Sequence, residues 1–341
     1  MASFTSKKKE MSFFGGDTAN VVEDIPISRQ GHKKALLIGI NYIGTKHELK
    51  GCIADVKHMQ DFLLSHRGYT NDPHHMLVMT DEARDSHLIP NLQNILAACQ
   101  WLVTGNNPGD SLFMHYSGHG GQVKGKSGQK EKEDTLIPLD YETKGQIDSD
   151  LLHRCLVRAL PVGVKLTVIL DCCHSGTMLE LPYTYLPDDG GIMTPKDALQ
   201  KVVVDMESVF KGGFSFESTP SKILEDISSI SHLFLHRPEV DSAGYKHEHF
   251  AEVEADNGQE KDVFVISGCK DMQTSADTSV QGYGSTGALS YAVSQKLREG
   301  GDVTFEGLLK HVRGFMRTNR LSQTPQLSCG VEVDPNAPFE F

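Results

Sequence analysis

The stretch KLTVILDCCHSG, residues 165–176, decides how the chain is expected to fold. Its largely apolar, β-branched first half predicts a buried strand. The tail that follows holds two adjacent cysteines, a histidine and a small Ser-Gly pair. Similar apolar runs alternate with helix-like segments along the chain, which is typical of a mostly parallel sheet covered by helices. We therefore expect an α/β fold.

Apolar runs elsewhere predict the rest of this sheet, which we expect to hold about six core strands with helices on both faces. The other runs are residues 35–40, 75–79, 110–116, 263–268 and a short one near 326–330. Helices are expected from Cys52 onward, from Pro90, and over 149–160 with Ser149 marking the start. Two more are expected over about 287–299 and 304–318.

The pattern divides the chain into two blocks separated by a looser region. Residues 31–187 and 262–341 carry the strand and helix signals and are expected to form the large and small regions of one domain. Residues 188–261 contain Gly-Gly pairs and scattered prolines, and we interpret them as a linker or insertion because so long a loop is unusual in a compact domain. Residues 1–30 are expected to be a mobile arm, and residues 124–134 a polar loop.

The composition excludes several classes of protein. The 341 residues include 45 Asp and Glu against 33 Lys and Arg, a formal net charge of −12. This balance disfavours nucleic acid as a partner and suits basic substrates or cations, although a solvated acidic surface is the alternative. No run is long enough to span a membrane or to form a secretory signal, so we expect a cytoplasmic protein, or one that is also nuclear, without a membrane partner. Seven cysteines without a CxxC pair indicate thiols rather than a structural zinc site.

Two motifs at expected strand ends indicate thiol catalysis. HYSGHGG (115–121) ends one strand and DCCHSG (171–176) ends another. The carboxyl ends of parallel strands line a common crevice, and a nucleophilic thiolate needs an imidazole nearby. His119 precedes Cys173 by 54 residues (173 − 119), close to the separation of about 50 in caspases. Because neighbours on an extended chain point to opposite sides, only one of Cys172 and Cys173 is expected to reach His119.

Four motifs in order make the resemblance specific. KALLIGINYIGTKHELKGCIADV (34–56), HYSGHGG, DCCHSG and SGCKDMQTSAD (267–277) together resemble a metacaspase, a caspase-related cysteine peptidase. The intervening segment is shorter than the very long linker of type II metacaspases, so the chain resembles type I. The resemblance implies a caspase-like fold, a monomer, Cys173 as the nucleophile and His119 as the general base. It also points to a role in programmed cell death or protein quality control, between which the sequence does not choose.

The cleft is expected to stabilise an oxyanion and to attract a basic side chain. The glycine-rich turn makes the backbone amides of Gly120 and Cys173 the candidate oxyanion donors, with a plain tight turn as the alternative. Asp55 and Asp171 make the cleft acidic, which favours Arg or Lys before the scissile bond. Capping of a loop is the other possible role for Asp171. The resemblance implies the same basic specificity; the predicted substrate-binding residues are Asp55, Asp171, Ser117 and Cys52, while Asp271 and Ser275 are weaker candidates.

The resemblance also implies dependence on Ca²⁺. The acidic residues that would supply oxygen ligands are Asp134, Asp148, Asp150 and Glu180. The family usually has two adjacent aspartates where this chain has Ser149-Asp150, so weaker affinity is expected. For acidic residues so far apart in sequence, a solvated surface is the alternative.

The hypothesis is therefore a calcium-dependent cysteine endopeptidase that cleaves protein substrates after exposed Arg or Lys. Basic residues in the linker suggest self-cleavage there. A caspase-fold binding scaffold of low turnover, acting in protein quality control, is the alternative function. Cleavage after Asp is disfavoured because a substrate carboxylate would meet like charge.

Overall fold

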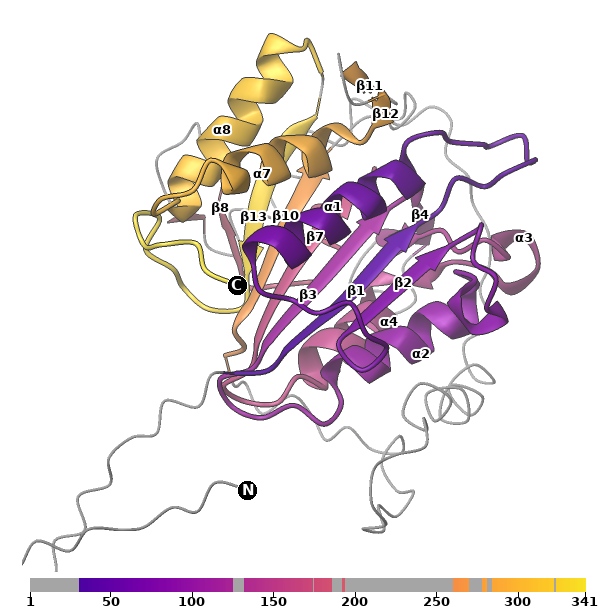
Figure 1. Ribbon diagram of the computed structural model, residues 1–341, viewed down its shortest axis with the longest axis horizontal. Coiled ribbons are helices and arrows are strands. Elements are labelled where there is room, and N and C mark those ends of the chain that lie inside the picture. The colour runs from indigo at the N-terminus through magenta and orange to yellow at the C-terminus, as the bar shows by residue number, and fades with distance from the viewer. Residues whose placement is uncertain are drawn as a thin grey trace, which may run out of the picture. The chain divides into compact units, whose positions relative to one another are not determined.

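The computed structural model describes residues 31–124, 132–173, 175–185, 192–193, 260–269, 278–280, 284–321 and 323–341. An eight-stranded sheet runs through this part of the chain (Figure 1). In spatial order its strands are β2 (Met76–Thr80), β1 (Lys33–Gly39), β3 (Ser111–Ser117), β7 (Lys165–Asp171), β10 (Val263–Cys269), β13 (Thr324–Cys329), β8 (Tyr183–Tyr185) and β9 (Ile192–Met193). The strands from β2 to β10 are parallel, and the remaining pairings are antiparallel. The six expected core strands are all present, and the α/β prediction is confirmed.

The central strands are buried on both faces, and successive side chains serve two different cores. In β1, Leu36 and Ile38 join one apolar cluster while Ala35 and Leu37 join the other. The same period of two continues in β3 and β7, as expected for strands whose side chains alternate between faces. Burial of such side chains contributes about 1.5–3 kcal/mol each, and this fixes the register of the sheet.

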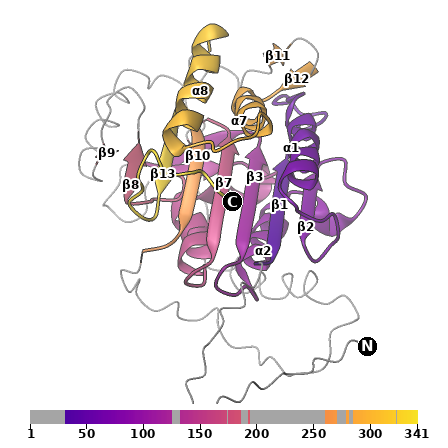
Figure 2. The ribbon, with the colours of Figure 1, turned by 60° about the vertical axis from the view of Figure 1, so that its left-hand side comes forward.

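Helices cover both faces, as predicted (Figures 1 and 2). One face carries α1 (Cys52–His66), α7 (Ala288–Arg298) and α8 (Phe305–Thr318). The other carries α2 (Leu92–Val103) together with α4 (Ser149–Leu152), which continues as the π-helical turn η2 (His153–Arg158). None of the described helices is long and apolar enough to cross a membrane.

Smaller elements lie outside the main sheet, and one of them shows that the expected polar loop over 124–134 is partly wrong. An antiparallel sheet consists of β4 (Gly120–Lys124), β5 (Lys132–Leu136) and β6 (Ile147–Asp148). The expected polar loop over 124–134 is therefore wrong at its ends, because Lys124 pairs with Lys132 and Gln122 pairs with Asp134. Polar residues of β5 are buried with partners instead of being solvated. The other elements are η1 (Ser86–Leu88), α3 (Tyr141–Lys144) and the hairpin of β11 (Thr278–Val280) and β12 (Gly284–Thr286).

One helix start and one helix cap differ from the expectation, although α4 begins at Ser149 as predicted. Helix α2 begins after Asn91, whose side chain accepts the N–H of Asn94 at 2.8 Å, and not at Pro90. Asp148, rather than Ser149, caps α4. In both cases a side-chain oxygen of the residue directly before the helix accepts an N–H group of the first turn.

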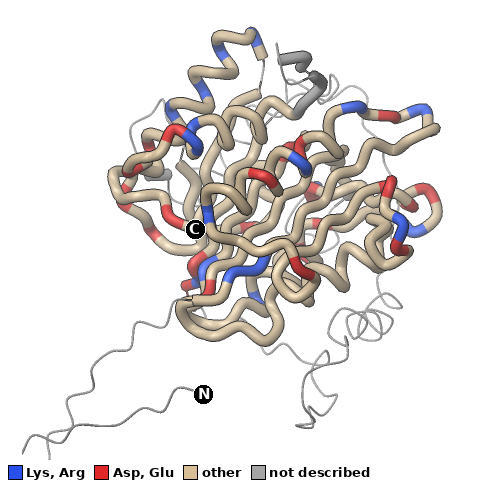
Figure 3. The backbone as a smooth tube through the Cα atoms, in the orientation of Figure 1, with Lys and Arg blue, Asp and Glu red and all other residues tan. Residues whose placement is uncertain are grey.

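Charged residues of both signs are interspersed along the described backbone (Figure 3). The predicted arm over 1–30 and nearly all of the predicted linker over 188–261 lie outside the described residues, so both stay predictions.

Candidate active site

The carboxyl ends of three neighbouring strands lie level at one edge of the sheet. Gly39 at the end of β1 pairs with Ser117 of β3, and Ser117 pairs with Asp171 of β7. The helix that leaves β1, α1, lies on one face, whereas α2, which leads into β3, lies on the other. The chain therefore changes direction between β1 and β3, and ligand sites of open α/β sheets form at such a switch point.

His119 follows β3, and two tyrosines hold its peptide groups in place. The N–H of His119 donates to the hydroxyl of Tyr42 at 3.1 Å, and its carbonyl accepts from the hydroxyl of Tyr116 at 2.8 Å. The rings of Tyr42 and His119 have centroids 4.6 Å apart. Tyr42 has a φ of 52°, a left-handed conformation that costs about 1–2 kcal/mol outside glycine. Strain of this kind is typical of positions where a fixed geometry serves function.

The protonation pattern of the His119 ring follows from its partner. Nε2 lies 2.8 Å from the backbone carbonyl of His47. A carbonyl oxygen only accepts, so Nε2 carries the proton, and in the neutral ring the lone pair is on Nδ1. The loop after β1 thus orients the imidazole and leaves Nδ1 as the atom able to take a proton from a thiol.

The two adjacent cysteines have different environments. The side chain of Cys172 is 1 % exposed and packs in the core on the α2 side. Burial raises the pKa of the Cys172 thiol well above its ordinary value, and the negative charges of Cys173 and Asp171 add to this. Cys173 is only partly buried. Of the two thiols, Cys173 is the one that a substrate can approach.

Gly120 brings the histidine turn directly against the cysteine loop. A Cβ atom at this position would lie 1.9 Å from the carbonyl oxygen of Cys173 and 3.3 Å from Sγ of Cys172. Only glycine permits this approach of two backbones. The two residues predicted to donate to the oxyanion, Gly120 and Cys173, are therefore in contact.

Two of the four predicted substrate-binding residues, Ser117 and Asp55, are hydrogen-bonded to each other, and Asp171 lies beside Ser117 in the sheet. The hydroxyl of Ser117 donates to Oδ2 of Asp55 at 2.7 Å. Oδ2 of Asp171 accepts the N–H of Ser290 at 2.8 Å. Asp55 and Asp171 are both buried, at 1 % and 4 % exposure. The fourth residue, Cys52, begins α1 one turn before Asp55 and is also buried.

Both carboxylates converge on the N-terminus of α7. Gly287, the residue before this helix, donates its N–H to Oδ1 of Asp55 at 2.7 Å. A Cβ atom on Gly287 would lie 2.3 Å from Oδ2 of Asp171 and 2.7 Å from Oδ2 of Asp55. Burial raises the pKa of Asp171, while hydrogen bonds from Ser290 and Leu289 oppose that rise. The positive end of the helix dipole thus offsets part of the buried negative charge.

The four predicted calcium ligands are spread over β5, β6, α4 and the segment of Glu180, and each has a protein partner. Asp134 accepts from Thr177 and Gln122, at 2.6 and 2.9 Å, and Glu180 accepts from the hydroxyl of Ser149 at 2.7 Å. Asp148 caps α4 and Asp150 pairs with Arg154. Within the described ranges, no group of three or more His, Cys, Asp or Glu residues could hold a metal ion. Oxygen donors of the right kind for Ca²⁺ are present, but their grouping in this structure does not form a site.

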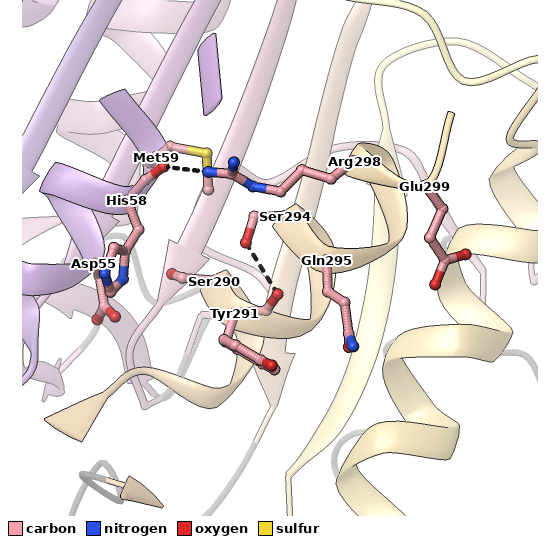
Figure 4. A pocket seen from close by; sticks show the side chains of 9 residues that line it. All are labelled: Asp55, His58, Met59, Ser290, Tyr291, Ser294, Gln295, Arg298 and Glu299. Atoms are coloured by element: carbon pink, nitrogen blue, oxygen red, sulfur yellow. Dashed lines mark hydrogen bonds between the residues drawn. The ribbon is translucent and has the colours of Figure 1, made fainter. Parts of the chain in front are cut away.

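A cavity of about 280 Å³ lies between α1 and α7 (Figure 4). Asp55 and Ser290 lie at one end of it, whereas Arg298 and Glu299 lie at the other. Neither His119 nor Cys173 lines this cavity, so it borders Asp55 from the helix side and does not include the thiol.

Sequence reasoning missed several residues of this site. Tyr116 belongs to the HYSGHGG motif and Tyr42 follows the first strand, so the sequence could have predicted their positions beside the site. It could not have predicted the hydrogen bonds of their hydroxyl groups. The contact between Gly287 and Asp55 joins residues 232 positions apart and has no local signal. His174, Asp271 and Ser275 lie outside the described residues.

The tyrosine contacts predict a specific defect. We expect Tyr42→Phe to lower kcat about tenfold with a small change in KM. The part-buried N–H of His119 loses its partner at a cost of about 1–3 kcal/mol, and the carbonyl of Ile137 loses one of its two tyrosine donors. Tyr185→Phe is the matched control, since its hydroxyl likewise contacts a backbone N–H and carbonyl, those of Val333, away from the site. Steady-state kinetics and melting temperatures of both variants test this. Equal losses of kcat would contradict a role of Tyr42 in positioning His119.

A thiol and an imidazole that follow neighbouring parallel strands, with the imidazole oriented by a backbone carbonyl, define a cysteine peptidase on a caspase-like sheet. Residues 33–182 match the family described as metacaspase, peptidase C14 domain. The chain is 40% identical over 309 residues to Metacaspase-1 of Schizosaccharomyces pombe, covering 90% of this chain and 69% of that protein. It is 42% identical over 316 residues to Metacaspase-1 of Mycosarcoma maydis, covering 92% and 74%. The chain belongs to the metacaspase family and is a cysteine-type peptidase.

A solved structure supports the fold alone. The crystal structure of a protein from Geobacter sulfurreducens superposes with a TM-score of 0.51 at 20% sequence identity. The match covers 91% of this chain and 97% of that one.

Proposed function

We propose that the protein is an endopeptidase that cleaves after Arg or Lys, with Cys173 as nucleophile and His119 as base. The observation that carries this proposal is a pair of buried carboxylates: Asp55 lies in α1, and Asp171 ends β7, the strand that leads directly into the cysteine loop. A basic substrate side chain would neutralise charge that the helix N-terminus offsets only in part.

The reaction would use groups that lie at the strand ends. Cys173 Sγ–H gives its proton to Nδ1 of His119, and the thiolate attacks the scissile carbonyl carbon. The amides of Gly120 and Cys173 would donate to the oxyanion that forms. The tetrahedral species collapses to a thioester as His119 protonates the leaving amine. Water, deprotonated by His119, then hydrolyses the thioester and regenerates the thiol.

The expected substrate preference can be measured directly. Three matched fluorogenic peptides ending in Arg, Lys or Asp would be offered to the wild type and to Cys173→Ala. We expect cleavage after Arg and Lys, with Arg favoured because its planar fork can pair with two carboxylates. Cleavage after Asp would contradict the charge argument while leaving the thiol mechanism intact. If the wild type cleaved none of the three peptides, the alternative, a binding scaffold of low turnover, would be favoured.

We also propose that Ca²⁺ activates the enzyme through Asp134, Asp148, Asp150 and Glu180. The support is the type of donor and the proximity of β5, β6 and the Glu180 segment, which the Ser149 contact joins. Because all four carboxylates have protein partners in this structure, Ca²⁺ binding would require them to exchange those partners for the ion. We expect weak binding, roughly millimolar, because Ser149 stands where relatives are expected to have a carboxylate. Calorimetric titration of Ca²⁺ into Cys173→Ala should give a binding isotherm that Asp134→Asn weakens and the exposed control Asp72→Asn does not. Equal activity in Ca²⁺ and in a chelator would remove the proposal.

Self-cleavage is the third part of the proposal. Basic residues in the predicted linker, all outside the described residues, are Lys196, Lys201, Lys211, Lys222, Arg237 and Lys246. We expect the wild type, but not Cys173→Ala, to convert into two fragments during incubation with Ca²⁺. A single unchanged band after long incubation of active enzyme would exclude self-cleavage. We further propose a monomer that acts in the cytoplasm or nucleus and has no nucleic-acid partner, which gel filtration, fractionation and nucleic-acid binding assays would test.

A further inference from the structure

A buried polar chain lies behind Asp171 on the side away from the thiol loop. Nε2 of His115 lies 2.8 Å from the hydroxyl oxygen of Ser290. The N–H of Ser290 donates to Oδ2 of Asp171 at 2.8 Å, and the Ser290 side chain also contributes to lowering the pKa of this carboxyl. His115 and Ser290 are 0 % and 3 % exposed, so water does not compete for these contacts.

The period of two along the strands brings these residues together. His115 in β3 and Asp171 in β7 point to the same face as Phe113 and Ile169, the face that α7 covers. Ser290 lies in the first turn of α7, above both strands. Apolar residues fill most of this layer, so a polar trio here has no packing advantage.

The proton positions follow from the chemistry of the three groups. A carboxylate only accepts, so the Ser290 hydroxyl favours the ionised form of Asp171 when its proton is turned toward that carboxylate. Its oxygen can then accept a proton from Nε2–H of His115, which is neutral because burial lowers its pKa to about 3. In this arrangement the atom of His115 with no partner among the described residues, Nδ1, is an acceptor. The reverse arrangement would bury an unpaired N–H and turn the hydroxyl proton away from the carboxylate.

We propose that Ser290 and His115 are positioning residues for substrate specificity, which hold the Asp171 carboxylate ionised and oriented for a basic substrate side chain. The inference rests on the proposed role of Asp171 in the specificity pocket. His115 is the first residue of the HYSGHGG motif, but no role for this histidine follows from the sequence. The cavity view shows Ser290 beside Asp55, at the end of the cavity that adjoins the acidic group (Figure 4).

The proposal predicts a change in the pH profile. The titratable groups that face Asp171 are Asp55 from α1, Cys172 from the adjoining loop and, through Ser290, His115 from β3. Burial favours the protonated acid, whereas the contacts with Ser290 and Leu289 favour the carboxylate. Removing the hydroxyl raises the pKa of Asp171, so the acidic limb of kcat/KM for an Arg peptide should move to higher pH.

The test compares Ser290→Ala with Ser294→Ala. Ser294 lies one turn further along α7, is also buried, and donates only to the carbonyl of Tyr291. We expect Ser290→Ala to reduce kcat/KM for the Arg peptide about tenfold, mainly through KM, and to move the acidic limb upward, while Ser294→Ala changes neither. His115→Met should give a smaller loss of the same kind, which His115→Gln, with an amide N–H to donate, partly restores.

Alkylation of Cys173 by iodoacetamide provides the second readout, because this small reagent does not need the specificity pocket. We expect Ser290→Ala to react at the wild-type rate, which separates a pocket defect from general damage. The positioning role alone would be overturned if Ser290→Ala kept the acidic limb of the wild type and a kcat/KM within twofold of it, while Asp171→Asn was inactive toward the Arg peptide. Retained Arg cleavage by Asp171→Asn would instead contradict the proposed specificity pocket itself.

Discussion

Cys173→Ala is expected to lower peptide hydrolysis by more than roughly 10³-fold, whereas Cys172→Ala is expected to keep kcat within a few fold of wild type. Cys173 is the partly exposed thiol beside the glycine turn that carries His119. Cys172 is sealed in the core with a raised pKa, so its thiol stays protonated and cannot attack. We therefore expect Cys173 to act in catalysis and Cys172 to act in packing.

The two variants should also separate in stability. Cys172→Ala removes a buried sulfur from a packed cluster and should lower the free energy of unfolding by about 1 kcal/mol, while Cys173→Ala should change it little. Active-site titration with iodoacetamide, followed by mass spectrometry of the modified peptide, identifies the reacting thiol. Modification at Cys172 in native enzyme, or residual turnover in Cys173→Ala, would contradict the assignment.

Asp171→Asn is expected to lower kcat/KM for Arg peptides by roughly 100-fold or more while the protein stays folded. The substrate cation would lose a buried charge partner, a loss worth about 2–5 kcal/mol. The free enzyme, by contrast, loses the repulsion between two carboxylates that approach the same glycine. We therefore expect a melting temperature equal to or above that of the wild type, a pattern typical of residues kept for activity at the expense of stability.

Asp110→Asn is the matched control for this substitution. Asp110 is as buried as Asp171, at 4 % exposure, and precedes β3 at the opposite end of the sheet. It accepts backbone N–H groups of His32 and Asn107 at 2.7 and 2.8 Å. We expect a lower melting temperature and unchanged preference for Arg. Loss of Arg cleavage in Asp110→Asn, or its retention in Asp171→Asn, would show that the carboxylate at β7 does not set specificity.

The six core strands were predictable because each is a short apolar run, and only burial on both faces of a sheet accounts for such runs. The sheet of β4, β5 and β6 was not predictable from the sequence, because its strands are polar or glycine-rich. They are stabilised by specific partners, such as the hydrogen bond between Gln122 and Asp134. The short strand β8 was missed for a related reason. It depends on an edge that β13 supplies from 139 residues further along the chain (324 − 185).

The sequence could predict the candidate site only for residues at the ends of the parallel strands or in the helix next to them. Asp55, Ser117 and Asp171 could be placed together because α1, β3 and β7 meet at one edge. The contribution of α7 was not predictable, since Gly287 and Ser290 reach the site by packing across the sheet and not by any spacing in the sequence. The tautomer of His119 likewise could not be predicted, because it depends on a backbone carbonyl, a group that every residue has.

The strand order β7-β10-β13-β8 has a consequence for the fate of a cleaved molecule. β7 and β8 precede the long predicted linker, whereas β10 and β13 follow it, so the later pair is inserted between two strands of the earlier part. A cut between Tyr185 and Glu260 would therefore leave two polypeptides joined by hydrogen bonds on both flanks of the inserted pair. The nicked molecule should elute as one particle in gel filtration and separate only under denaturing conditions. Scission here would relax the connection between the halves without releasing either of them.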